Sequence, residues 1–155
     1  VRVDAYGTVD ELNSHLGYAI SLMEGKDEFE EMKEEMVRIQ SDLFDLGSAL
    51  ATSGGTVDLS ERISELERQI DRVSDKLPPL RSFILPGGTS IASSLHICRT
   101  VTRRAERKVV ALAQGEGVDP GILQYLNRLS DLLFVWARLA NQLAGREDIA
   151  WSSRQ

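Results

Sequence analysis

Apolar residues recur at spacings of three and four along most of this chain, which is the period of an amphipathic helix. The pattern predicts a first helix over residues 9–23, a second over residues 29–50 and a third over residues 59–77. Thr8 and Glu11 have the spacing of a capping box, which favours a helix start at Val9. Three amphipathic helices therefore account for most of the first half of the chain.

Residues that favour helix starts or helix ends mark the boundaries of the remaining helices. Asp58 is a possible N-cap of the third helix, and Pro78 cannot continue it. A fourth helix is expected from Thr89 or Ser90 to about residue 114, and a fifth from the N-cap pair Asp119-Pro120 to about residue 143. Five helices with short connections and no alternating strand pattern predict an all-α fold, an antiparallel five-helix bundle that residues 1–155 form as a single domain.

The connection between the third and fourth helices is unusually apolar. Residues 83–88 read Phe-Ile-Leu-Pro-Gly-Gly, which is too apolar for an ordinary solvated loop, and we expect this run to pack against a further surface or group. The tail after Arg146 has no helical pattern and is expected to be peripheral. The acidic run of residues 24–35 is expected to be a solvated helix face.

Composition and charge narrow the classes of function. The chain is 42% hydrophobic, has a single cysteine and lacks the run of roughly 20 apolar residues that a membrane span needs. We therefore expect a cytoplasmic protein without disulfides, and the net charge of −6 argues against nucleic acid as a partner. Residues 1–77 carry 8 basic and 18 acidic groups, whereas residues 78–155 carry 10 and 6. An anionic ligand is expected to bind the second half.

One face of the fourth helix is basic. At about 100° per residue, Arg99, Arg103 and Arg107 share a stripe with His96 and Glu106, opposite an apolar stripe. The arginines either grip a polyphosphate or form a solvated or interface face of ion pairs, and their spacing leaves both interpretations open. The same positive charge favours a neutral His96.

Two other helices carry polar residues in unexpected places. One stripe lies within the mostly apolar fifth helix and the other on the first helix; they consist of Asn127, Asp131, Phe134 and Arg138, and of Asp10, Asn13, Ser14 and Gly17. Buried polar groups need partners, so these stripes indicate either a ligand site between helices or subunits or a polar contact between helices.

Several standard sites are excluded by their spacing. Neither His15 nor His96 follows a Glu by three residues, so the sequence predicts no carboxylate metal centre. Cys98 lies on the apolar stripe of the fourth helix and is interpreted as a core residue rather than a nucleophile. Residues 86–88 lack the Lys and Ser or Thr of a Walker loop.

Four motifs together resemble one known family. They are residues 5–14 (AYGTVDELNS), 83–88 (FILPGG), 103–107 (RRAER) and 125–131 (YLNRLSD), and in this order they are similar to the ATP:cob(I)alamin adenosyltransferases of the propanediol-utilisation (PduO) type. The resemblance covers nearly the whole chain. It implies a five-helix bundle that assembles as a homotrimer with active sites between subunits. The implied reaction transfers the 5′-deoxyadenosyl group of ATP to the Co(I) of reduced cobalamin and releases triphosphate.

The resemblance also implies site residues. Arg103, Arg107 and Phe83 would be catalytic; the ATP site would consist of Arg103, Arg104, Glu106, Arg107 and Asn127. Arg99 would pair with Asp10 of a neighbouring subunit. Phe83 would line the corrin pocket and exclude the lower axial base of cobalamin; the alternative interpretation is a simple hydrophobic plug.

The remaining expectations concern cofactors and partners. Mg²⁺ would accompany the triphosphate, and a cobalamin reductase or a B12-dependent enzyme would be a further partner. In the family, a Gly- and Thr-rich segment with a nearby Lys precedes the first motif and wraps the phosphates; this chain begins after that segment, and we expect a trimmed N-terminus. The alternative function is a non-catalytic sensor or interaction protein that binds ATP and cobalamin.

Overall fold

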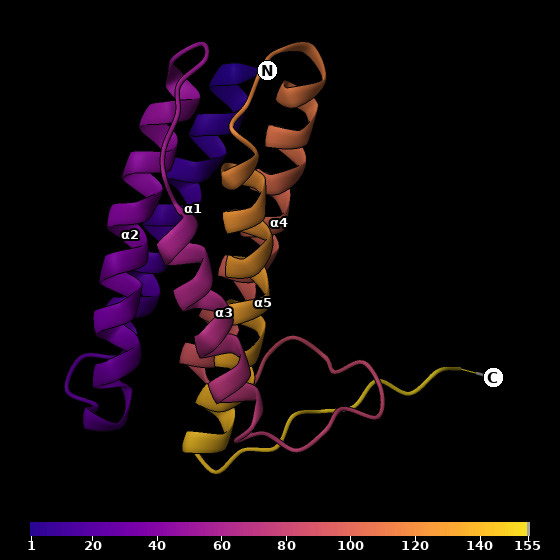
Figure 1. Cartoon of the computed structure of the whole chain (residues 1–155). Coiled ribbons are helices and arrows are strands. Elements are labelled where there is room, and N and C mark those ends of the chain that lie inside the picture. The colour runs from indigo at the N-terminus through magenta and orange to yellow at the C-terminus, as the bar shows by residue number, and fades with distance from the viewer. Residues whose placement is uncertain (155) are drawn as a thin grey trace.

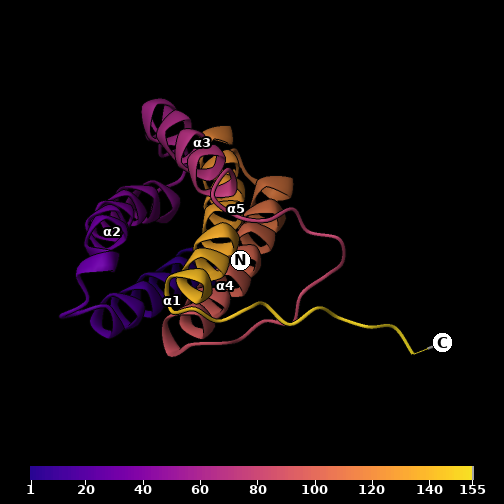
Figure 2. The same ribbon diagram turned by 90° about the horizontal axis from the view of Figure 1, so that it is seen from below.

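The computed structural model describes residues 1–154, and within them it is a bundle of five α-helices. The helices are α1 (Arg2–Leu22), α2 (Glu30–Ala51), α3 (Ser60–Ser74), α4 (Ser90–Gly115) and α5 (Pro120–Leu143). In space, α4 packs against both α1 and α5, α2 packs against α1, and α3 packs against α5 (Figures 1 and 2). The predicted all-α fold is confirmed. No described helix is both long and apolar enough to cross a bilayer.

The first helix begins seven residues earlier than the capping box predicts. The Thr8 hydroxyl donates to the Asp4 carbonyl at 2.7 Å, so it bonds back within the helix and does not cap it. Ala5 and Val9 are buried, which extends the apolar stripe of α1 toward Arg2. The predicted start at Val9 is therefore wrong, because burial of this stripe outweighs a local capping signal.

The other boundaries agree more closely with the sequence. A 3₁₀ turn over Asp27–Phe29 precedes α2, and α3 ends at Ser74, three residues before the predicted end. Asp58 accepts from the Ser60 amide at 3.1 Å at the start of α3. The predicted start of α4 and the predicted cap of α5 are confirmed: α4 begins at Ser90, with the Thr89 side chain accepting from the Ala92 amide, and Asp119 accepts from the Gly121 amide.

Cys98 lies in the apolar core between the helices and is fully buried, as the sequence predicts. Burial raises the pKa of its thiol to about 12. The thiolate, which is the reactive form, is therefore nearly absent at neutral pH.

We accordingly expect Cys98 to resist aromatic disulfide reagents at pH 8 in the native protein and to react within seconds in denaturant. The comparison is one absorbance measurement with and without 6 M guanidinium, at matched protein concentration. Rapid labelling of the native chain would contradict the burial of this thiol.

A polar network links α2, α3 and α5 at the border of the apolar core. Arg62 of α3 donates to Glu35 at 2.5 Å and to Asp42 at 2.8 Å, and Tyr125 of α5 donates to the same Asp42 carboxylate at 2.6 Å. The two carboxylates raise the pKa of Arg62 against the opposing effect of its burial. Glu35 is thus buried and paired, which corrects the expectation that the whole acidic run is solvated.

Replacing Arg62 with methionine is expected to destabilise the fold by about 3 kcal/mol, because two mostly buried carboxylates would lose their shared cation. Glu35 would keep only the exposed Arg38, and Asp42 only the Tyr125 hydroxyl. Urea unfolding at pH 7 measures the loss. The matched control is Arg68→Met on the same helix, whose exposed pair with Glu65 should contribute less than about 1 kcal/mol. Equal losses in the two variants would show that the network adds nothing.

Two irregular segments leave the bundle together at one end. The strap (residues 78–88) joins α3 to α4, and the tail (residues 146–151) follows α5 (Figures 1 and 2). The Leu85 amide donates to the Ile149 carbonyl at 2.8 Å, and the Trp151 amide donates to the Phe83 carbonyl at 2.7 Å. The tail is almost wholly exposed, as the sequence predicts, but it also pairs with the strap through an antiparallel bridge between Ile84 and Ala150, a short backbone ladder.

Candidate active site

A cleft of about 710 Å³ lies between the strap and the exposed faces of α4 and α5. Its lining combines cationic, anionic and aromatic side chains; the residues are Leu80, Arg81, Ser82, Phe83, Ile84, Pro86, His96, Arg99, Arg103, Ser130, Asp131 and Phe134. The predicted stripes of α4 and α5 therefore meet in one place. Three of the four motifs contribute to it: Phe83 comes from the second, Arg103 from the third and Asp131 from the fourth.

Arg99 and His96 form the deepest polar part of this cleft wall. The guanidinium of Arg99 lies 6.0 Å from the centre of the Phe134 ring, and its Nε is buried without a hydrogen-bond partner among the described residues. Burial, and secondarily the charge of Arg103, lower the pKa of Arg99. A half-buried arginine with a buried, unused donor is suited to an anionic partner from outside the chain.

His96 is buried beside Arg99 and packs edge-on to Phe134, with ring centres 6.3 Å apart. Burial is the main cause of its lowered pKa, and the Arg99 charge is the second. The ring is thus neutral at pH 7, as the sequence predicts. Neither ring nitrogen has a partner within the described chain.

The arginines of the third motif point to different surroundings. Arg103 is exposed and lines the cleft, whereas Arg107, one turn further along α4, is exposed outside the lining. Arg104 forms an ion pair with Glu11 of α1. Of the three, only Arg103 is thus placed in the cleft of this chain.

Glu106 and Asn127 lie beside each other on neighbouring helices. The Asn127 side-chain amide donates to Glu106 at 3.2 Å, and its oxygen accepts from Arg128 at 2.7 Å. Arg128 also pairs with Asp131 at 2.6 Å, and Asp131 is one of the residues that line the cleft. The predicted ATP residues Glu106 and Asn127 are therefore linked to Asp131 through Arg128.

Phe83 stands at the strap side of the cleft and is 78% exposed. Its one recorded aromatic neighbour is Trp151 of the tail, edge-on with ring centres 6.2 Å apart. Leu85 is also largely exposed. The apolar run is therefore only partly covered within the chain, and an exposed aromatic ring facing a cleft is suited to an apolar ligand.

The polar stripe of α1 lies elsewhere. Asn13 and Gln40 of α2 exchange two side-chain to backbone hydrogen bonds of 3.1 and 3.2 Å, so this part of the stripe is a polar contact between helices. Asp10 is exposed and lines a small hollow with Phe44 between α1 and α2. Among the described residues no hydrogen bond or ion pair joins Asp10 to Arg99 in one chain.

Besides His96, four polar residues that line the cleft are not among the site residues that the resemblance implies. Arg81 and Ser82 line it from the strap, and Ser130 and Asp131 line it from α5. Asp131 shares the helical stripe of Asn127, and this periodicity is a signal that identifies it. Arg81 and Ser82 carry no such signal because the strap has no regular period.

Comparison with known proteins assigns the chain to a family. The sequence profile described as cobalamin adenosyltransferase matches residues 1–140. A corrinoid adenosyltransferase of Bacillus subtilis is 46% identical over 97% of this chain and 80% of its own length. A cobalamin adenosyltransferase of Cupriavidus metallidurans is 45% identical over 97% of this chain and 80% of its own length.

Solved structures agree with the sequence comparison. A variant of the PduO-type ATP:corrinoid adenosyltransferase of Lactobacillus reuteri, solved with cobalamin and ATP, superposes with a TM-score of 0.93 at 40% identity. The match covers 98% of this chain and 86% of that one. This chain therefore belongs to the cobalamin adenosyltransferase family, and the resemblance of its four motifs to the PduO type is confirmed.

Proposed function

We propose that this corrinoid adenosyltransferase transfers the 5′-deoxyadenosyl group of ATP to the Co(I) of a reduced corrinoid in the cleft between the strap, α4 and α5. The observation that carries the proposal is that Arg103 and Phe83 line the same cleft. A guanidinium is suited to the triphosphate and an exposed aromatic ring to the corrin face. The cleft thus offers surfaces for both substrates next to each other.

The proposed reaction depends little on general acid or base catalysis by side chains. Co(I) supplies the electron pair of the new cobalt–carbon bond, the C5′–oxygen bond of ATP breaks, and its electron pair leaves with the triphosphate. Negative charge on the leaving oxygen increases during this step. Arg103 can stabilise that charge with a donor held in place before the reaction. Arg107 would extend the same cationic surface along α4, one turn away.

Phe83 would act on the cobalt side of the reaction. A corrinoid that loses its lower axial base is more easily reduced to Co(I), and an aromatic ring cannot replace that base as a ligand. The exposed ring stands in the cleft at the end of the strap, where it could exclude the base. This argument favours an active role of Phe83 over that of a simple plug.

A homotrimer would complete the site. Arg99 has a buried, unused donor, and Asp10 is an exposed carboxylate on α1 of the same chain. Pairing of Arg99 with Asp10 of a neighbouring subunit would satisfy both groups and place subunit contacts at the cleft. Arg104, Glu106 and Asn127 would then hold the nucleotide from the α4 and α5 side.

The proposal includes Mg²⁺ bound to the triphosphate. Asp131 is the one carboxylate that lines the cleft, which fits an ion held mainly by phosphate oxygens and water. A reductase is a further proposed partner, because Co(I) must be produced before transfer. A cytoplasmic location is supported by the single, buried cysteine.

The test uses the full-length protein under anaerobic conditions with ATP and chemically reduced cobalamin. We expect the absorbance spectrum of adenosylcobalamin and one triphosphate for each molecule formed. ATP at 100 times its dissociation constant should also stabilise the fold by about 2.7 kcal/mol. Binding of both substrates without triphosphate release would support the sensor instead, and absence of any ATP effect would support an interaction protein.

A further inference from the structure

The strap that carries Phe83 has almost no apolar packing of its own. Phe83 and Leu85 are exposed, and the segment contains no helix or long strand. Something other than hydrophobic burial must therefore fix the position of the ring. The backbone hydrogen bonds to the tail support the strap. Because the tail is itself irregular, the strap and the tail together need an attachment to the helices.

Both ends of the strap are bound by two buried polar side chains of α5. Arg138 donates to the Pro78 carbonyl at 2.7 Å, where the strap begins. Asn141 donates to the Gly87 carbonyl at 3.0 Å and accepts from the Thr89 amide at 3.0 Å, where the strap ends. The two side chains are 7% and 2% exposed, so these bonds are shielded from water.

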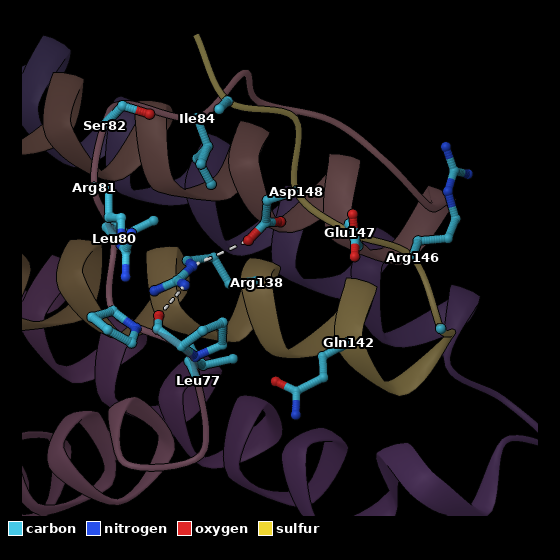
Figure 3. A pocket seen from close by; sticks show the side chains of 14 residues that line it. Leu77, Leu80, Arg81, Ser82, Ile84, Arg138, Gln142, Arg146, Glu147 and Asp148 are labelled. Carbon is cyan, nitrogen blue, oxygen red and sulfur yellow. Dashed lines mark hydrogen bonds and ion pairs between the residues drawn. The ribbon is translucent and has the colours of Figure 1, made fainter.

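The tail is bound by the same two residues. Asp148 accepts from Arg138 at 3.1 Å and from Asn141 at 3.2 Å, one bond on each carboxylate oxygen. Figure 3 shows Arg138 between the strap and the tail, with its bonds to Pro78 and Asp148 drawn across a pocket of about 590 Å³. Arg138, Asn141 and Asp148 form one unit, which we name the clamp.

The close fit at the end of the strap supports this arrangement. Gly88 has φ of +116°, and a Cβ there would lie 2.2 Å from the Asn141 side-chain oxygen. Only glycine permits the backbone to approach Asn141 so closely. The second glycine of the second motif (residues 83–88) is thus explained by the clamp and not by contact with a ligand.

We propose that Arg138, Asn141 and Asp148 are positioning residues for the reaction, and that they act through Phe83. The clamp holds the strap at both ends and the tail in its middle, so the Phe83 ring is fixed over the cleft and Trp151 stands beside it. This inference rests on the proposed function, because it concerns the corrin side of the same cleft. The clamp residues themselves, unlike Phe83, line none of the cleft.

The first experiment measures the anchor without substrates. In Asp148→Ala we expect the amides of residues 83–85 and 149–151 to exchange hydrogen about tenfold faster, since the ladder loses its link to α5. Peptides from α1 and α2 should exchange as in the wild type. The control is Glu147→Ala, which changes the adjacent exposed carboxylate of the tail and should leave the exchange unaltered.

The second experiment is a double-mutant cycle with Phe83→Ala in the full-length protein. Asp148→Ala should lower kcat/KM for reduced cobalamin about 10- to 100-fold, mostly through KM, and leave KM for ATP unchanged. In the Phe83→Ala background the same substitution should have little further effect, because the aromatic ring that Asp148 helps to position is absent. Asp148→Asn keeps the side-chain shape and provides the same cycle should the alanine variant fold poorly.

The outcomes separate the two proposals. Multiplicative losses in the double variant, or an Asp148→Ala chain with wild-type exchange and wild-type KM, would overturn the clamp as a positioning device. A rise in KM for ATP equal to that for cobalamin would also overturn it, since general loosening of the fold would then explain the effect. A wild-type protein that forms no adenosylcobalamin contradicts the proposed function itself, whatever the exchange data show.

Discussion

Arg103→Ala is expected to lower kcat by roughly 10³-fold while the thermal midpoint of unfolding stays within a few degrees of the wild type. Arg103 is exposed and makes no ion pair among the described residues, so its removal leaves no buried group without a partner. The large effect on rate follows from the lost stabilisation of the leaving triphosphate. Single-turnover absorbance of adenosylcobalamin formation measures it under anaerobic conditions.

Two further variants test the cause of this loss of rate. One separates the geometry of the Arg103 side chain from its charge, and the other is a control outside the cleft. Arg103→Lys keeps the charge but loses the planar fork of donors, and we expect it to recover only part of the rate. Arg72→Ala removes an exposed arginine of α3, outside the cleft, and should turn over as the wild type. A loss confined to KM for ATP, with kcat unchanged, would show that Arg103 binds the ground state and not the transition state.

The bundle was predictable because the apolar residues of each helix repeat at a regular spacing that can be recognised within a short segment of sequence. Apolar residues of α4 such as Leu95, Ala105 and Leu112 are all buried, as their spacing predicts. The same logic brought the arginine stripe of α4 and the polar stripe of α5 to one cleft. The resemblance of the motifs supplied the chemistry that spacing left open, namely a polyphosphate and a corrinoid.

The clamp was not predictable, because it depends on contacts between residues far apart in the sequence. Arg138 could be recognised only as a polar residue within an apolar helix, and its partners Pro78 and Asp148 lie in segments without a period. Glu35 was misread for a related reason: it lies in an acidic run, and its partner Arg62 is a full helix away. Local pattern identifies a polar residue in an unusual place but not the group that binds it.

Arg99→Ala is expected to weaken both assembly and activity. The Arg99 donor is buried beside Phe134 and has no partner within the described chain, so the proposed pair with Asp10 of a neighbouring subunit would be partly shielded from water. Loss of one member of a buried pair costs about 3 to 5 kcal/mol, and the remaining Asp10 carboxylate would face an apolar surface at the interface. At micromolar concentration this cost should shift a trimer toward monomers.

Sedimentation velocity of Arg99→Ala and Arg103→Ala separates the two roles on one helix. We expect an intact trimer for Arg103→Ala and a concentration-dependent loss of trimer for Arg99→Ala, whose activity should recover in part as protein concentration rises. Asp10→Asn, at the other end of the proposed pair, should weaken the trimer in the same way although it lies on α1. Equally stable trimers in all three variants would remove Arg99 from the interface and leave the cleft as its only site of action.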